Sequence, residues 1–100
     1  MTYAKEYDEV EQGDRMKISE VMHSRYLERR WEDIRICEEL LELQEFDAIA
    51  RVGHNLKGNG KTFGHPEFST LGEKLEKAAN HRDDGQIKEI LINLEAKITH

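Results

Sequence analysis

The sequence predicts an all-α protein that folds as an antiparallel up-down-up-down four-helix bundle. Its 100 residues include one proline and seven glycines, and β-branched or aromatic clusters are scarce, so the composition favours helix. Apolar residues recur every three or four positions in four successive stretches, which is the spacing of amphipathic helices. The connections between these stretches are only a few residues long, so neighbouring helices are expected to run antiparallel within one small domain.

The chain opens with a polar, acidic stretch that has no sustained apolar period. We predict an acidic, mobile leader over residues 1–16 and the helical domain over residues 17–100. Ser19 is the predicted N-cap of the first helix. The apolar stripe of that helix consists of Leu27, Trp31, Ile34, Cys37 and Leu41.

Three further helices are predicted after the first. Gly64 fits a left-handed C-terminal cap of the second helix, and Pro66 fits the first turn of the third. Asp83 and Gln86 resemble a capping box at the start of the fourth. The predicted buried faces are Phe46, Ile49, Gly53, Leu56, Gly60 and Phe63 in the second helix, Phe68, Leu71, Leu75 and Ala78 in the third, and Ile87, Ile90, Leu91, Leu94 and Ile98 in the fourth.

The charge balance narrows the classes of function. A formal net charge of −6 with 36% charged residues indicates a soluble protein and argues against binding to nucleic-acid backbones or anionic membranes. No apolar run approaches the ~20 residues that span a bilayer, and the N-terminus lacks the apolar core of a signal peptide, so we expect a cytoplasmic protein. Cys37 is the single cysteine and lies on a core stripe; we expect a buried apolar residue, with a redox thiol as the alternative.

The stretch GHNLKGNGKT, residues 53–62, contains residue types that proteins use around phosphate. Its end, Gly60-Lys61-Thr62, resembles the end of a nucleotide-binding P-loop, G-x-x-x-x-G-K-[ST]. The preceding EFDAIARV, however, has helical rather than strand spacing, and Asn55 stands where a P-loop needs its first glycine. The sequence therefore argues against a nucleotide site.

Placed on a helix, the same stretch presents His54 to solvent, roughly 130° from the centre of the apolar stripe. A neutral imidazole is a nucleophile that attacks phosphorus without a separate general base. Lys57 lies one turn along and is the nearest cation to neutralise phosphoryl oxygens. Arg51, Gly58 and Lys61 share the solvent side of the helix.

The glycines of this helix need a physical reason, because each costs about 1 kcal/mol relative to alanine. Gly53 and Gly60 lie on the core stripe, where a missing side chain lets a neighbouring helix approach closely. Gly58 lies on the open face one turn beyond His54, where a side chain would obstruct a partner that approaches the imidazole.

The residues around His54 resemble a known family signature. His54-Asn55-Leu56-Lys57-Gly58-Asn59-Gly60, followed by Phe63-Gly64, Leu71 and Leu75-Glu76, is similar to the signature of histidine-containing phosphotransfer (HPt) domains of bacterial two-component phosphorelays. The resemblance covers about residues 19–98 and includes the flanking YLERRWEDI and EFDAIARV. It implies a four-helix bundle whose histidine takes a phosphoryl group from a receiver-domain aspartate and passes it to another receiver. Carried onto this chain, it implies that His54 is phosphorylated on Nε2, that Lys57 assists the phosphoryl group, and that Gly58 keeps the docking surface open.

The same resemblance implies a carrier rather than an enzyme, with no ATP site, no bound cofactor, and Mg²⁺ held by the partner receiver domain. The expected partners are response-regulator receiver domains and a hybrid histidine kinase, and we expect a monomer. A bundle that docks a signalling partner without transferring phosphate is the alternative function.

Other polar residues have two interpretations each. Arg51, Lys61 and Asn55 are expected at the docking surface, with a merely solvated face as the alternative, and the same two roles stay open for Asn59. No two of the five histidines have the i, i+4 spacing of a helical zinc site, so no metal site is expected.

Overall fold

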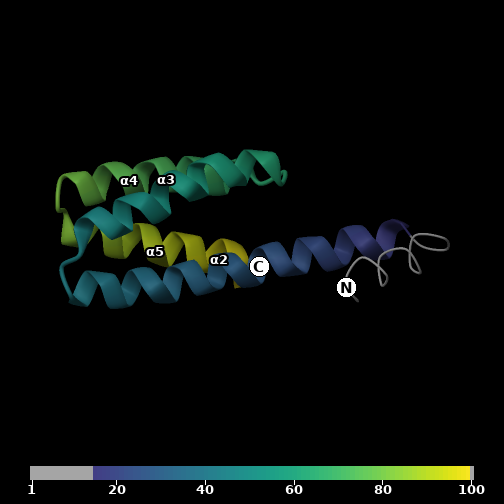
Figure 1. Cartoon of the computed structure of the whole chain (residues 1–100), viewed down its shortest axis with the longest axis horizontal. Helices are drawn as coiled ribbons and strands as arrows, with labels where there is room; N and C mark the ends of the chain where they lie inside the picture. Colours follow the sequence, from purple (N-terminus) through teal and green to yellow (C-terminus); the bar gives the residue numbers. More distant parts are fainter. Residues whose placement is uncertain (1–14, 100) are drawn as a thin grey trace.

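The structure is a computed structural model that describes residues 15–99, with side chains from residue 20 onward. This part of the chain folds into four helices. The helices are α2 (Arg15–Glu42), α3 (Phe46–Thr62), α4 (Pro66–Asn80) and α5 (Asp84–Thr99). Each packs against its neighbours along the chain, and α5 returns to pack against α2 (Figure 1). Within the described residues the diagonal pairs, α2 with α4 and α3 with α5, have no Cα atoms within 8 Å of each other. The predicted all-α four-helix bundle is therefore confirmed.

The longest helix, α2, has 28 residues, and its N-terminal end projects past the other three (Figure 1). The prediction that Ser19 caps this helix is wrong, because the helix begins at Arg15 and Ser19 lies inside it. Arg15, Met16 and Lys17 are good helix formers, so the helix extends past a residue that also suits a cap. The rest of the predicted leader, residues 1–14, lies outside the described residues.

The predicted apolar stripes form the core with one exception, Phe63. Its side chain is 55% exposed, because Phe63 is the C-terminal cap residue of α3 and the helical projection no longer sets its direction there. Its ring stacks instead on Tyr26 of α2, with ring centroids 5.1 Å apart. Leu27, Trp31 and Ile98 are partly buried against the core. The other predicted side chains are buried: Ile34, Cys37, Leu41, Phe46, Ile49, Leu56, Phe68, Leu71, Leu75, Ala78, Ile87, Ile90, Leu91 and Leu94.

All three turns between the helices use the same hydrogen-bonded cap. A residue with positive φ follows each of α2, α3 and α4: Gln44 (58°), Gly64 (81°) and Arg82 (54°). The predicted cap at Gly64 is confirmed; the other two were not identified because residues other than glycine rarely adopt this conformation. In each turn the next N–H donates to a carbonyl five residues back: Glu45 to Leu40 at 2.9 Å, His65 to Gly60 at 2.7 Å and Asp83 to Ala78 at 2.9 Å.

The predicted capping box at the start of α5 is half present. The Gln86 backbone N–H donates to Asp83 Oδ1 at 3.1 Å. The Asp83 backbone N–H donates to Ala78 in the preceding turn, so the reciprocal bond from Asp83 to the Gln86 side chain is replaced. The Asp83 carboxylate thus caps α5, while the Asp83 backbone N–H closes the turn after α4.

Helices α3 and α4 pack most closely, and three glycines, which we call the glycine seam, allow this: Gly53, Gly60 and Gly72. The close approach predicted at Gly53 and Gly60 is confirmed, whereas Gly72 was not identified from the sequence. The facing backbone leaves no room for side chains here. A Cβ added to Gly53, Gly60 or Gly72 would lie 2.6 Å from the Glu76 nitrogen, 2.5 Å from the Ser69 nitrogen or 2.5 Å from the Lys57 nitrogen, respectively.

Cys37 is fully buried in α2, which favours the apolar interpretation over the redox thiol. Burial, with smaller contributions from the charges of Asp33 and Glu38, raises the pKa of the Cys37 thiol to about 12. The thiolate is the reactive form of cysteine, so this side chain is protected both by its surroundings and by its protonation.

We therefore expect Cys37 to resist alkylation by iodoacetamide at pH 8 in the folded protein and to react readily in urea, as measured by intact-mass spectrometry. Because the folded pKa of about 12 lies above the ordinary 9.0, the stability that the protonated thiol contributes is complete below pH 9 and is lost as the pH rises toward 12. Rapid modification of the folded protein at pH 8 would contradict the buried, protonated thiol.

Candidate functional site

His54 lies in the middle of α3 with its side chain 68% exposed. Its chain neighbour Gly53 is buried against α4, and Leu56 is buried in the core, so the same helical turn directs the imidazole outward. The prediction that His54 faces solvent is confirmed. The imidazole is therefore reachable by a macromolecular partner.

The imidazole of His54 is oriented by a residue of the next helix. Its Nδ1 lies 3.2 Å from Oε2 of Glu76 in α4, whose side chain is 27% exposed. A carboxylate only accepts hydrogen bonds, so in the neutral imidazole this contact favours the tautomer that carries its proton on Nδ1 and its lone pair on Nε2. The contact thus leaves the nucleophilic nitrogen on the open side of the ring.

Sequence reasoning assigned no role to Glu76, although the register of the α3–α4 hairpin contains a signal for it. Residues equally distant from the turn at Gly64 and His65 face one another across the glycine seam. Gly53 faces Glu76 in this register, so a side chain at position 76 is next to His54. Reading the glycines as a seam before placing the site would have identified this carboxylate.

Lys57 is exposed one turn after His54, where their Cβ atoms are roughly 5–6 Å apart. Among the described residues its ammonium group forms no ion pair, so no carboxylate competes with an incoming phosphoryl group. The Lys57 carbonyl accepts a hydrogen bond from the buried Ser69 hydroxyl of α4, which holds this turn of α3 against its neighbour.

The four residues predicted for docking are all exposed on α3, but they do not form one cluster. A Cβ at Gly58 would meet no other atom within 4 Å, which matches the open space predicted there. Arg51 and Lys61 lie within about 60° of His54 around the helix axis, whereas Asn55 is turned away by about 100°. Neither Arg51 nor Lys61 forms an ion pair within the described chain. Their docking role stays a prediction.

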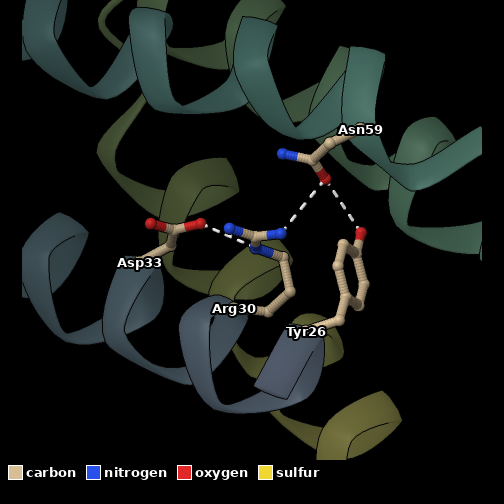
Figure 2. A network of polar contacts seen from close by, with 4 residues as sticks. All are labelled: Tyr26, Arg30, Asp33 and Asn59. Carbon is tan, nitrogen blue, oxygen red and sulfur yellow. Dashed lines mark hydrogen bonds and ion pairs between the residues drawn. The ribbon is translucent and has the colours of Figure 1, made fainter. Parts of the chain in front are cut away.

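Asn59 connects α3 to α2 through a polar network (Figure 2). Its Oδ1 accepts hydrogen bonds from the Tyr26 hydroxyl at 2.9 Å and from Arg30 Nη1 at 3.3 Å. Arg30 Nε in turn pairs with Asp33 Oδ2 at 2.8 Å, and its guanidinium lies 4.6 Å from the centre of the Tyr26 ring. Burial raises the pKa of Tyr26 despite the opposing effect of Arg30, so its hydroxyl stays protonated as the donor. Asn59 thus links α3 to α2, a role that neither of the two alternatives considered from the sequence included.

The segment that resembled a P-loop is the last turn of α3. Gly60, Lys61 and Thr62 are helical, and the Thr62 hydroxyl donates to the Gly58 carbonyl at 3.2 Å within the helix. Gly60 belongs to the glycine seam rather than to a phosphate-binding loop. The prediction that a helix and not a strand precedes this segment is confirmed.

Residues 15–99 show neither a three-ligand metal site nor a membrane-spanning helix. No group of three or more His, Cys, Asp or Glu side chains in this range is placed to hold a metal ion. Across the same residues, every helix is too short or too polar to cross a membrane.

Comparison with known proteins identifies the family. A family model described as Hpt domain matches residues 21–98, which includes His54, Lys57, Glu76 and the glycine seam. No match was found among curated proteins or among solved structures. Hpt domains are histidine-containing phosphotransfer modules of phosphorelays, act as carriers rather than catalytic enzymes, and interact with receiver domains and kinases. Because the matched region spans most of the chain and contains the exposed histidine on a four-helix bundle, the protein belongs to the Hpt domain family.

Proposed function

We propose that the chain is a phosphorelay intermediate whose His54 accepts a phosphoryl group from a receiver-domain aspartyl phosphate and passes it to the aspartate of another receiver domain. The contact between His54 Nδ1 and Glu76 carries this proposal, because it holds an exposed imidazole with Nε2 free to react. The encounter takes place in the cytoplasm, between this protein as a monomer and successive receiver domains.

The chemical step needs no general base. As the Nε2 lone pair of His54 forms the N–P bond, the P–O bond to the receiver aspartate breaks and the aspartate leaves as a carboxylate. Nδ1 keeps its proton, so the phosphorylated ring carries a positive charge. The Glu76 carboxylate, 3.2 Å from Nδ1, stabilises that charge as a carboxylate stabilises the imidazolium of a Ser-His-Asp triad. Transfer to the second receiver reverses these bond changes at a new aspartate.

The negative charge on the oxygens of the transferred phosphoryl group is neutralised from two sides. Lys57 approaches the phosphoryl oxygens from this chain, and Mg²⁺ held by the receiver domain approaches them from the other side. In this proposal the step uses no nucleotide and no cofactor bound to residues 15–99. Gly58 leaves space beside the imidazole, so a receiver can bring its aspartyl phosphate in line with Nε2.

The test is transfer from a receiver domain phosphorylated with ³²P in the presence of Mg²⁺. We expect acid-labile, base-stable label on the wild-type protein, mapped to His54 by mass spectrometry, and no label on His54→Gln. His81→Gln is the matched control, since His81 is also exposed on a helix end and should leave labelling unchanged. Label that persists on His54→Gln refutes the site. Absence of label on the wild type, with receiver binding retained, would favour a docking module that transfers no phosphate.

A further inference from the structure

Two histidines from different parts of the fold meet beside the turn between α3 and α4. His65 is the N-cap residue of α4, and His23 is an exposed residue of α2. Their ring nitrogens, Nε2 of His65 and Nδ1 of His23, are 3.2 Å apart. Spacing along one helix does not predict this pair, because the two residues are 42 positions apart in the sequence. The pair lies past the C-terminal end of α3, away from His54 in the middle of that helix.

The imidazole of His65 is fixed by its neighbours. Its side chain is 14% exposed, and its ring stacks on Tyr26 with ring centroids 4.9 Å apart and an angle of 1° between the planes. The ring of Phe68 packs against it at a tilt, with centroids 5.2 Å apart. The backbone is fixed as well, since the His65 N–H donates to the Gly60 carbonyl at 2.7 Å. His65 therefore presents Nε2 to His23 from a rigid position.

The separation of these two nitrogens matches that of two histidines bound to one metal ion. Zinc–nitrogen bonds are about 2.0–2.1 Å long, so two nitrogens at the tetrahedral angle are about 3.3–3.4 Å apart. The observed 3.2 Å differs from this by only about 0.2 Å. A hydrogen bond between two neutral imidazoles has a similar length, so the protein without metal already holds both nitrogens in place. A metal ion would take the place of the shared proton.

Glu67 is the carboxylate that a metal-binding histidine commonly has beside its other ring nitrogen. Its Oε2 lies 3.8 Å from Nδ1 of His65, and its side chain is 45% exposed. Such a carboxylate accepts the Nδ1 proton and leaves the lone pair on the nitrogen that binds the metal. A small rotation of the exposed Glu67 side chain brings its carboxylate within hydrogen-bonding distance. Exposed His23 leaves one side of the pair open to solvent, so water can fill the other coordination positions.

We propose that His23 and His65 form a two-histidine site for a divalent transition-metal ion such as Zn²⁺, which joins α2 to the turn between α3 and α4. Imidazole nitrogen suits Zn²⁺, Cu²⁺ and Ni²⁺, whereas Mg²⁺ prefers oxygen ligands. On binding, His23 carries its proton on Nε2, so both facing nitrogens offer lone pairs. The two ligands converge only when α2 packs against the turn, so the ion stabilises the folded chain. The inference is independent of the proposed function, because His54 is not a ligand.

The test is titration of the full chain with Zn²⁺, followed by calorimetry and by thermal unfolding. We expect one ion to bind per chain, and at a free Zn²⁺ concentration about ten times the Kd the melting temperature should rise by about 5 °C. Mg²⁺ should cause no rise. His23→Gln should lower the Zn²⁺ affinity about tenfold or more, because one of two converging ligands is lost. His23 is exposed, so this variant should fold as the wild type does.

His81→Gln and His54→Gln are the matched controls, since each removes one exposed histidine elsewhere and should leave Zn²⁺ binding unchanged. In the wild type, Zn²⁺ should shift the ¹⁵N resonances of His23 Nδ1 and His65 Nε2. Wild-type affinity in His23→Gln overturns the inference, as does the absence of Zn²⁺ binding to the wild type. Loss of binding in His54→Gln also overturns it, because the ion would then lie between His54 and Glu76. None of these results bears on phosphotransfer, so the proposed function is tested separately.

Discussion

Replacement of Gly60 by alanine should lower the free energy of unfolding by about 2–3 kcal/mol, although alanine is the better helix former. The new Cβ would lie 2.5 Å from the Ser69 nitrogen and 2.9 Å from the His65 carbonyl oxygen. Both are backbone atoms, so relief requires α4 to move away from α3, which loosens the packing along the whole glycine seam. Urea denaturation monitored by circular dichroism measures the loss as a lower midpoint at unchanged slope.

Gly58→Ala is the control within the same helix. Because a Cβ at Gly58 meets no atom within 4 Å, the substitution should raise the free energy of unfolding by about 1 kcal/mol through helix preference alone. A bulkier Gly58→Leu should keep the fold but slow phosphotransfer, since its side chain fills the space beside His54. If Gly58→Ala and Gly60→Ala lowered the free energy of unfolding equally, close packing at the glycine seam would not explain the cost at Gly60.

Replacement of Glu76 by alanine should slow phosphotransfer through His54 about tenfold or more while leaving the fold intact. Without the carboxylate, the imidazole of His54 rotates freely, both tautomers are populated, and the positive charge of the phosphorylated ring loses its partner. Single-turnover transfer from a phosphoreceiver measures the rate. The ¹⁵N chemical shifts of His54 report the tautomer and should show that the Nδ1–H form no longer dominates.

Two further variants test whether Glu76 acts by orienting the imidazole of His54 or by stabilising the positive charge of the phosphorylated ring. Glu76→Gln keeps an oxygen that accepts from Nδ1, so it should restore the tautomer and only part of the rate. Glu73→Ala removes a carboxylate one turn earlier on α4 that pairs with Lys77 at 3.5 Å, and it should leave transfer unchanged. Wild-type transfer by Glu76→Ala would mean that the contact with His54 has no role in the reaction.

Local sequence signals predicted much of this protein, because they depend on neighbours along the chain. The period of three to four placed the four helices, and the same projection directed His54 to solvent and Gly53 and Gly60 to the core. Where the helical geometry stops, the projection fails: Phe63 follows the last helical residue and is exposed. A capping preference alone also failed at Ser19, because upstream helix formers extend α2 past it.

The contacts between helices depend on how the helices are aligned with one another, and the apolar period of a single helix does not predict this alignment. Which residue of α4 lies beside His54 is set by backbone contact at the glycine seam, and this decides that Glu76 orients the imidazole. The same holds for Asn59, whose structural role depends on where α2 places Tyr26 and Arg30. The sequence by itself determined the helices, the exposed histidine and the family signature, since these follow from local periodicity and residue type. Only the tertiary structure decided that Glu76 contacts that histidine and that Asn59 joins α3 to α2, because both contacts arise where side chains from different helices meet.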